Sequence, residues 1–273
     1  MKLHLELLSD RDRNSWDRMV KANPYSCFMQ SWTWAGFKEL QGYKTWRYGL
    51  FCGEDSNREC TSEKLVGGCI FYLYPQLGGA NILLAAGGAI LSPEWADQGM
   101  SLLLESAEQL ACEYSAFSNT SLIALRIEPL WESKPHWLPT DFVRSPADLM
   151  PTETLLIDLK LTTDQLLAQM KPKGRYNLRL SWRYGVNTEF RQDDAAIALF
   201  YDLFWDTSQR QNFFGEPFGF FINLCQSLFP DNMAEIGIAR WQGEILAVIL
   251  VIYWGDRCTY LYGGRSVQHP HVM

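Results

Sequence analysis

A dense group of prolines divides this chain more clearly than any other sequence feature. Residues 129–151 contain Pro129, Pro135, Pro139, Pro146 and Pro151. Proline lacks the backbone N–H that helix interiors and central strands need, so neither element can run through this segment. The sequence therefore predicts two folded parts, residues 1–150 and 151–273, with a proline-rich linker at the end of the first.

The first part alternates short strands and helices, which is typical of α/β and α+β folds. Ser9 and Asp12 have the spacing of a capping box, and Ser31 can cap a second helix that carries Trp34, Phe37 and Lys38. Strands are expected at residues 2–8, 44–52, 65–74, 81–86 and 121–128, and helices at 9–21, after Ser31, and at 93–117.

The second part repeats the same order, in which a strand and helices precede a meander. Gln242-Gly243 lies between two strand-like runs and predicts a tight hairpin. Strands are expected at 154–159, 186–190, 235–241, 245–254 and 258–262, with helices from 162, from about 173, at 194–209 and at 217–229.

Composition excludes several classes of protein. The apolar fraction of 47% indicates a globular chain, and the net charge of −7 argues against a protein that coats DNA or RNA. The longest apolar run, residues 245–254, is too short to cross a bilayer, so we expect a cytoplasmic protein. Seven cysteines without a CxxC pair predict reduced, mostly buried thiols and no metal site.

One segment reverses the overall charge. Residues 165–188 contain no acid but carry Lys171, Lys173, Arg175, Arg179 and Arg183, so subtracting these five charges from −7 leaves −12 on the rest. Pro172 suits the first turn of a helix, on which the three arginines recur every four residues along one side. The segment is either a solvated basic surface or a binding site for a phosphate group, since the guanidinium group matches phosphate geometry.

Several motifs together resemble the FemABX family of peptidoglycan aminoacyltransferases. The central ones are residues 153–159 (ETLLIDL), 173–179 (KGRYNLR) and 184–186 (YGV). Others are Gln30-Ser31 with Trp34 and Lys38, residues 87–91 (GGAIL), 243–247 (GEILA) and 260–264 (YLYGG). They occur in the family's order over nearly the whole chain.

The resemblance implies two acetyltransferase-like (GNAT) domains and the transfer of an amino acid from aminoacyl-tRNA to the stem peptide of a peptidoglycan precursor. It implies that Lys38 and Arg175 hold the diphosphate of a nucleotide- or lipid-linked precursor, that Lys173 and Arg179 lie beside it, and that Tyr262 lines the acceptor channel. The expected partners are this precursor and the acceptor end of the tRNA, without DNA or a bound cofactor, and a peripheral membrane contact is compatible with them.

Each of these residues also has a structural alternative. Lys38 can be a surface lysine whose stem covers apolar neighbours, and Tyr262 can be a packed strand residue. No residue stands out as a catalytic base; Asp158 is a candidate, with the alternative that it pairs with the nearby cations.

The family pattern continues beyond Ser266 with a helix and further strands, so the resemblance implies that the second domain of this chain is incomplete.

Two other functions remain open. One is a non-catalytic relic or precursor-binding protein. The other is an acetyl-CoA-dependent N-acetyltransferase, which Pro93 and Glu94 disfavour because they stand where a phosphate-binding loop needs N–H donors and no negative charge.

Overall fold

The computed structural model describes residues 2–53, 63–76, 78–117 and 120–272. The chain divides into two compact units, the first comprising Met1–Met150 with Trp254–Asp256, and the second comprising Pro151–Tyr253 with Arg257–Met273. No sequence signal indicated that Trp254–Asp256 would group with the first unit.

The first unit is built on a mostly antiparallel sheet in which β4 and β6 pair in parallel. The strand order is β1–β2–β3–β4–β6, and the short β5 pairs with β3. Its strands are β1 (Lys2–Leu7), β2 (Thr45–Gly53), β3 (Lys64–Pro75), β4 (Asn81–Ala86), β5 (Ile90–Leu91) and β6 (Leu122–Glu128).

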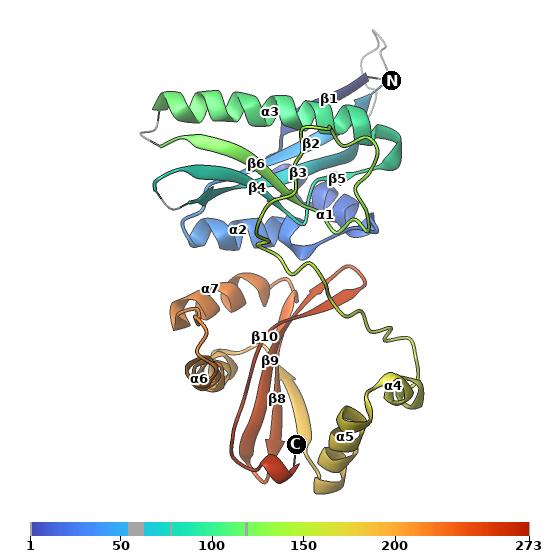
Figure 1. Ribbon diagram of the computed structural model, residues 1–273, viewed down its shortest axis with the longest axis vertical. Helices are drawn as coiled ribbons and strands as arrows, with labels where there is room; N and C mark the ends of the chain where they lie inside the picture. The colour runs from blue at the N-terminus through green and yellow to red at the C-terminus, as the bar shows by residue number, and fades with distance from the viewer. Residues whose placement is uncertain (1, 54–62, 77, 118–119, 273) are drawn as a thin grey trace. The chain divides into compact units, whose positions relative to one another are not determined.

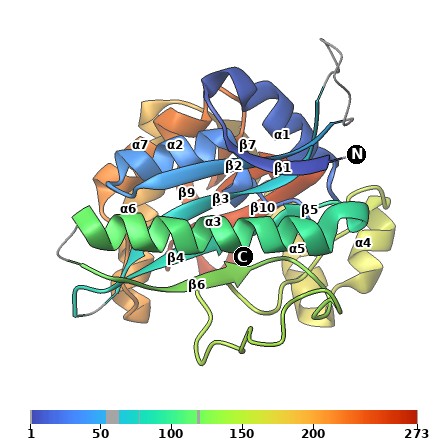
Figure 2. The same cartoon turned by 90° about the horizontal axis from the view of Figure 1, so that it is seen from above.

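Helices cover both faces of this sheet (Figures 1 and 2). The long α3 (Ala96–Phe117) lies on one face and packs Met100 and Leu103 against Leu50 and Phe71 of the strands. On the other face lie α1 (Arg13–Ala22) and α2 (Trp32–Leu40). The two predicted caps are present: Ser9 and Asp12 form the capping box, and Ser31 Oγ accepts a hydrogen bond from the N–H of Trp34.

A buried amide links the first unit's layers. Gln30 is fully buried; its Nε2 donates to the carbonyls of Ile70 and Ala86, and its Oε1 accepts from the N–H of Ile70 at 2.8 Å. Gly88 packs against this amide so closely that a Cβ there would lie 2.8 Å from it. Two of the motifs that suggested a family resemblance thus have a packing role in this fold.

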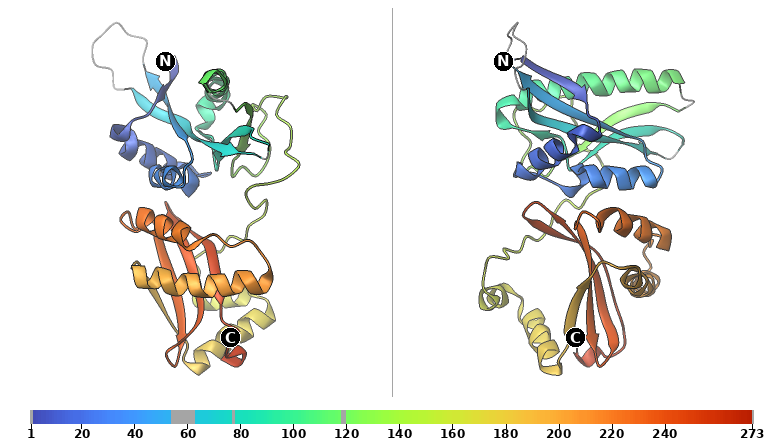
Figure 3. Two further views of the ribbon diagram at one scale, coloured as in Figure 1. Left: turned by 90° about the vertical axis from the view of Figure 1, so that its left-hand side faces the viewer. Right: turned by 180° about the vertical axis from the view of Figure 1, so that it is seen from behind.

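The second unit has a four-stranded sheet of order β10–β9–β8–β7. The pair α6 and α7 lies on one side of the sheet, and α4 and α5 lie on the other (Figures 1 and 3). Its strands are β7 (Asn187–Arg191), β8 (Ala234–Trp241), β9 (Glu244–Trp254) and β10 (Arg257–Arg265), and its helices are α4 (Thr163–Gln169), α5 (Pro172–Tyr184), α6 (Asp194–Gln211) and α7 (Phe218–Leu228).

Local sequence explains how these elements begin and end. Thr162 and Gln165 form a capping box at α4, Pro172 occupies the first turn of α5, and Asp193 accepts a hydrogen bond from the N–H of Ala196 at the start of α6. The predicted β8–β9 hairpin is confirmed: both central residues, Gln242 and Gly243, have positive φ, as a tight hairpin turn requires.

One expected strand is wrong. Residues 154–159 form no strand, and no strand among the described residues pairs with them. A run of apolar residues forms a strand only where a neighbour completes the hydrogen-bonded ladder. Without one, this segment stays irregular, and Leu155, Leu156, Ile157 and Leu159 are 58% to 83% exposed.

None of the described helices is long and apolar enough to cross a bilayer. Cysteines 27, 52, 69 and 225 are buried, Cys112 and Cys258 are exposed, and Cys60 lies outside the described residues. Burial raises the pKa of Cys69 and raises that of Cys225 to about 12, so these two thiols stay protonated and are poor nucleophiles.

Candidate functional site

Helix α5 lies on the surface of the second unit, and none of its residues is buried. Its C-terminal turn is well anchored: Gly185 ends the helix with φ of 75°, and the indole N–H of Trp241 donates to the carbonyl of Tyr184 at 3.1 Å. The rings of Tyr184 and His271 also meet, at a centroid distance of 5.8 Å. One side of α5 is therefore exposed to solvent on a helix that is anchored at its C-terminal end.

The cations of α5 have no acidic partner among the described residues. Arg175 is half-buried, whereas Lys173, Arg179 and Arg183 are exposed. Within the described parts of the chain, none of them forms an ion pair with a carboxylate. Uncompensated guanidinium groups on neighbouring turns repel one another, so an anion bound between them would stabilise the helix.

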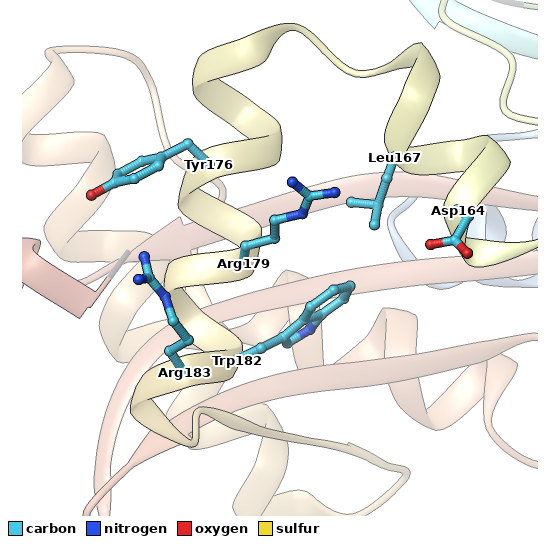
Figure 4. Close-up of a pocket in the computed structure, with 6 residues that line it drawn as sticks. All are labelled: Asp164, Leu167, Tyr176, Arg179, Trp182 and Arg183. Carbon is cyan, nitrogen blue, oxygen red and sulfur yellow. The ribbon is translucent and has the colours of Figure 1, made fainter.

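A pocket of about 690 Å³ lies where α4 meets the exposed side of α5. Figure 4 shows Arg179 and Trp182 pointing toward α4, while Tyr176 and Arg183 extend together on the other side of α5. Its lining residues are Asp164, Leu167, Tyr176, Arg179, Trp182 and Arg183. The pocket thus combines two cations, two ring systems and one acid.

The candidate residue Lys38 lies on α2, in the first unit. It is half-buried, and its ammonium nitrogen lies 3.8 Å from the centroid of the Tyr43 ring. This cation–π contact places the ammonium group on a neighbouring ring, and the half-buried side chain agrees with the alternative in which the stem of Lys38 covers apolar neighbours. Lys173, Arg175 and Arg179, in contrast, all lie on α5 in the second unit.

Tyr262 lies on β10 in an aromatic cluster. Its ring is 5.2 Å from that of Phe221 and 5.7 Å from that of Phe204, between centroids. Burial, with a smaller contribution from the negative charge of Glu216, raises the pKa of Tyr262 to about 12. The hydroxyl is therefore a neutral group at physiological pH.

Asp158 has a local structural role. It is exposed, and its Oδ1 accepts a hydrogen bond from the backbone N–H of Lys160 at 2.9 Å, which closes a turn. It lies in the segment that was expected to be a strand. The predicted pairing with the nearby cations is not formed between Asp158 and any described cation.

One trio of described side chains has the spacing of metal ligands: His4, Glu6 and Glu63, whose ligand atoms lie within 4.8 Å of one another. His4 Nε2 lies 3.3 Å from the Glu6 carboxylate and 3.6 Å from that of Glu63. Contacts within the trio account for this arrangement without an ion.

Sequence reasoning missed part of the pocket. It identified the arginine stripe but not the rings of Tyr176 and Trp182 or the α4 residues Asp164 and Leu167. A signal was present for one of them: Trp182 follows Arg175 by seven residues, which is two helical turns and hence the same side of α5. The α4 residues depend on the turn between two helices, which no short motif specifies.

Comparisons with known proteins agree on sequence and fold. The family described as Acetyltransferase (GNAT) domain matches residues 172–272. The lipid II:glycine glycyltransferase of Staphylococcus aureus (strain MRSA252) is 23% identical over 241 residues, which cover 82% of this chain and 52% of that protein. The protein of the same name from Staphylococcus saprophyticus is 24% identical over 244 residues, covering 82% and 53%.

Among solved structures, the crystal structure of FemX superposes with a TM-score of 0.76 at 16% identity, over 97% of this chain and 81% of that one. The chain therefore has a GNAT fold like that of FemX. The two sheets of this FemX-like chain are consistent with two GNAT-like halves, as the motifs predicted. The chain spans about half the length of the curated relatives it matches.

Proposed function

We propose that this chain transfers an amino acid from aminoacyl-tRNA to the stem peptide of a peptidoglycan precursor. The observation that carries the proposal is helix α5, where Lys173, Arg175 and Arg179 lie without acidic partners among the described residues. The similarity to the lipid II:glycine glycyltransferases supports the choice of substrates.

The N-terminal half of α5 is the proposed diphosphate site. Arg175 can form two parallel hydrogen bonds to phosphate oxygens, and Lys173 adds a flexible charged side chain two residues earlier. The positive end of the helix dipole strengthens both interactions. Lys38 is a further proposed phosphate-binding residue, for which its cation–π contact with Tyr43 would have to be exchanged for a phosphate.

The transfer step needs little from the protein's own acids and bases. A neutral amine of the stem peptide attacks the ester carbonyl of the aminoacyl-tRNA, a C–N bond forms, and the C–O bond to the ribose breaks. The amine proton leaves to solvent or substrate, and the ribose oxygen is protonated. Because the ester is already activated, positioning of the two substrates supplies most of the rate. Tyr262 is proposed to line the acceptor channel through its neutral hydroxyl.

A second candidate is an acetyl-CoA-dependent N-acetyltransferase, which the name of the matching GNAT family favours. Pro93 and Glu94, however, form the short turn that leads into α3. Pro93 offers no N–H donor there, and Glu94 places a negative charge where pyrophosphate would bind.

The proposed activity is tested by incubating the chain with charged tRNAs and a precursor that carries a pentapeptide. Mass spectrometry should detect a stem peptide that is heavier by one amino-acid residue, and ribonuclease treatment should abolish the product. Acetylation from acetyl-CoA without any tRNA requirement would refute the proposal in favour of the second candidate. Precursor binding without transfer would indicate a non-catalytic binding protein.

The diphosphate site gives a sharper prediction. Arg175→Ala should weaken binding of the nucleotide-linked precursor by about 1.5–3 kcal/mol, because a charge-assisted hydrogen bond is lost. Isothermal titration calorimetry measures this change directly.

Arg183→Ala is the matched control, since it removes the same group about 12 Å farther along α5, beyond the reach of one diphosphate. Equal affinities of wild type and Arg175→Ala would contradict the assignment of Arg175.

A further inference from the structure

The exposed faces of α5 and α6 carry the same side-chain pattern with opposite charges. On α5, residues 179–183 read RLSWR, and on α6, residues 202–206 read DLFWD. In both segments the first and fifth residues are charged and the fourth is a tryptophan. All six of these residues are exposed, with Trp182 at 49% and Trp205 at 40%. Each helix therefore presents two like charges beside an aromatic ring.

The two arginines of this pattern have no carboxylate partner among the described residues. Arg183 lies against the ring of Tyr176 instead, with its guanidinium carbon 6.0 Å from the ring centroid. Like charges four residues apart on a helix repel each other. An opposite charge placed against Arg179 and Arg183 would therefore stabilise α5.

The two aspartates of α6 are in the same position. Neither Asp202 nor Asp206 forms an ion pair with a described cation. Arg210 follows Asp206 by one turn, but its guanidinium group donates to the hydroxyl of Thr207 and to the carbonyl of Arg265, both at 3.1 Å. The acidic face of α6 thus needs a cation from elsewhere, as the basic face of α5 needs an anion.

A single chain cannot bring these two faces together, because α6 lies on one side of the sheet and α5 on the other (Figures 1 and 3). We propose that α5 of one copy of the chain binds α6 of a second copy. Four residues span about 6 Å along either helix axis, so two guanidinium groups can lie opposite two carboxylates at once. The match holds whether the two helices run parallel or antiparallel.

The side chains of α5 leave room for a helix along its exposed face. Arg179 and Trp182 lean toward α4, whereas Arg183 leans to the other side of α5 (Figure 4). A helix laid along this face passes between the two guanidinium groups, each of which can form paired hydrogen bonds with a carboxylate. The contact also covers both exposed tryptophans, and tryptophan is one of the residues that contribute most to protein interfaces.

The contact joins two different surfaces, so it does not close on itself in a pair. Each added copy leaves one α5 and one α6 free, and assembly can therefore continue as the concentration rises. One helix against another is a small interface, which is typical of weak and reversible association. Because the attraction is between exposed charges, salt should weaken it. Neither tRNA nor precursor takes part, so the inference is independent of the proposed function.

Sedimentation velocity over a range of concentrations tests the contact. The weight-average mass of the wild type should rise above the 31.4 kDa of one chain, and raising the salt from about 0.05 M to about 0.5 M should reverse part of the increase. An apolar contact would not weaken with salt in this way. The double variant Arg179→Glu, Arg183→Glu should raise the dissociation constant at least about tenfold, because α5 and α6 then carry the same charge. The double variant Asp202→Arg, Asp206→Arg should do the same.

Mixing the two charge-reversed variants gives the decisive result. In an equimolar mixture, α5 of each variant meets an α6 of opposite charge on the other, so association should return to the wild-type level. Loss of folding in either variant cannot produce this recovery. A mixture that stays dissociated although both variants give wild-type circular dichroism spectra would contradict the pairing of α5 with α6.

Two further variants complete the test. Lys64→Glu, Lys160→Glu changes the net charge by the same amount as the arginine reversal, at exposed positions outside both helices, and should associate as the wild type does. Arg179→Gln, Arg183→Gln removes the charges without introducing repulsion, and it keeps the test valid if the glutamate variant fails to fold. Wild-type association in the folded glutamine variant, or a wild-type chain that remains monomeric at every concentration, would overturn the inference.

Discussion

At the scale of single residues, Tyr262 shows how packing and chemistry are coupled. Its ring completes the aromatic cluster around Phe204 and Phe221, and the same enclosure keeps its hydroxyl protonated. The residue was singled out as a channel residue, with core packing as the alternative. The ring contacts of Tyr262 with Phe204 and Phe221 agree with the core-packing alternative. If Tyr262 also lines a channel, it does so through its hydroxyl group, because the ring is already packed.

The raised pKa of Tyr262 predicts a pH dependence of stability. Burial and Glu216 keep the hydroxyl protonated in the folded state up to a pKa of about 12, whereas the unfolded chain releases this proton near pH 10. Its contribution to the unfolding free energy is thus complete below pH 10 and is lost as the pH rises toward 12. The loss has a slope of at most about 1.4 kcal/mol per pH unit.

Urea unfolding at a series of pH values from 9 to about 11.5 measures this slope. Tyr262→Phe keeps the ring and removes the proton, so its unfolding free energy should fall less steeply than that of the wild type. Tyr260→Phe, at a neighbouring exposed position, should follow the wild type. Parallel curves for all three chains would argue against enclosure of the Tyr262 hydroxyl.

At the scale of elements, local signals were sufficient where an element depends on its own residues. Helix α5 was predicted from Pro172 and the arginine spacing, and the β8–β9 hairpin from Gln242-Gly243. The strand predicted at 154–159 is wrong because a strand depends on a neighbour that lies elsewhere in the chain, and a local run of apolar residues does not specify one. Asp164 and Leu167 were missed for the same reason, since α4 contributes them to the pocket only through tertiary structure.

The irregular segment 154–159 leads to a prediction about association. Leu155 and Ile157 expose apolar side chains, and the backbone of their segment is not paired with a described strand. A second chain can cover such a surface, so the wild-type chain should self-associate with increasing concentration. The double variant Leu155→Ser, Ile157→Ser should raise the dissociation constant of the dimer at least tenfold. Each apolar side chain removed from water contributes on the order of 1.5–3 kcal/mol.

Sedimentation velocity over a range of concentrations measures this association. Val143→Ser is a suitable control, because Val143 is 87% exposed in an irregular segment of the first unit and lies outside the strand-like pattern. If the double variant and the control sediment alike, the segment does not mediate association.

At the scale of the whole molecule, charge is strongly segregated. Residues 165–188 carry a net charge of +5 and the rest of the chain carries −12, so the overall net charge of −7 describes neither region. A local positive field on a negative protein attracts an anionic group to one surface and repels long nucleic acid from the others. This distribution suits a headgroup or an RNA end, and it suits extended duplex binding poorly.

The anchoring of α5 has a further consequence. The helix has no buried residue, and its contacts with Trp241 and His271 lie at its C-terminal turn. An element held in this way opens locally at a free energy well below that of global unfolding, so its amide hydrogens exchange early. An anion that bridges its guanidinium groups adds its binding free energy to the closed helix alone. A bound anion should therefore slow the exchange of the α5 amide hydrogens more than that of amides in the sheet, which hydrogen exchange measured with and without the precursor would detect.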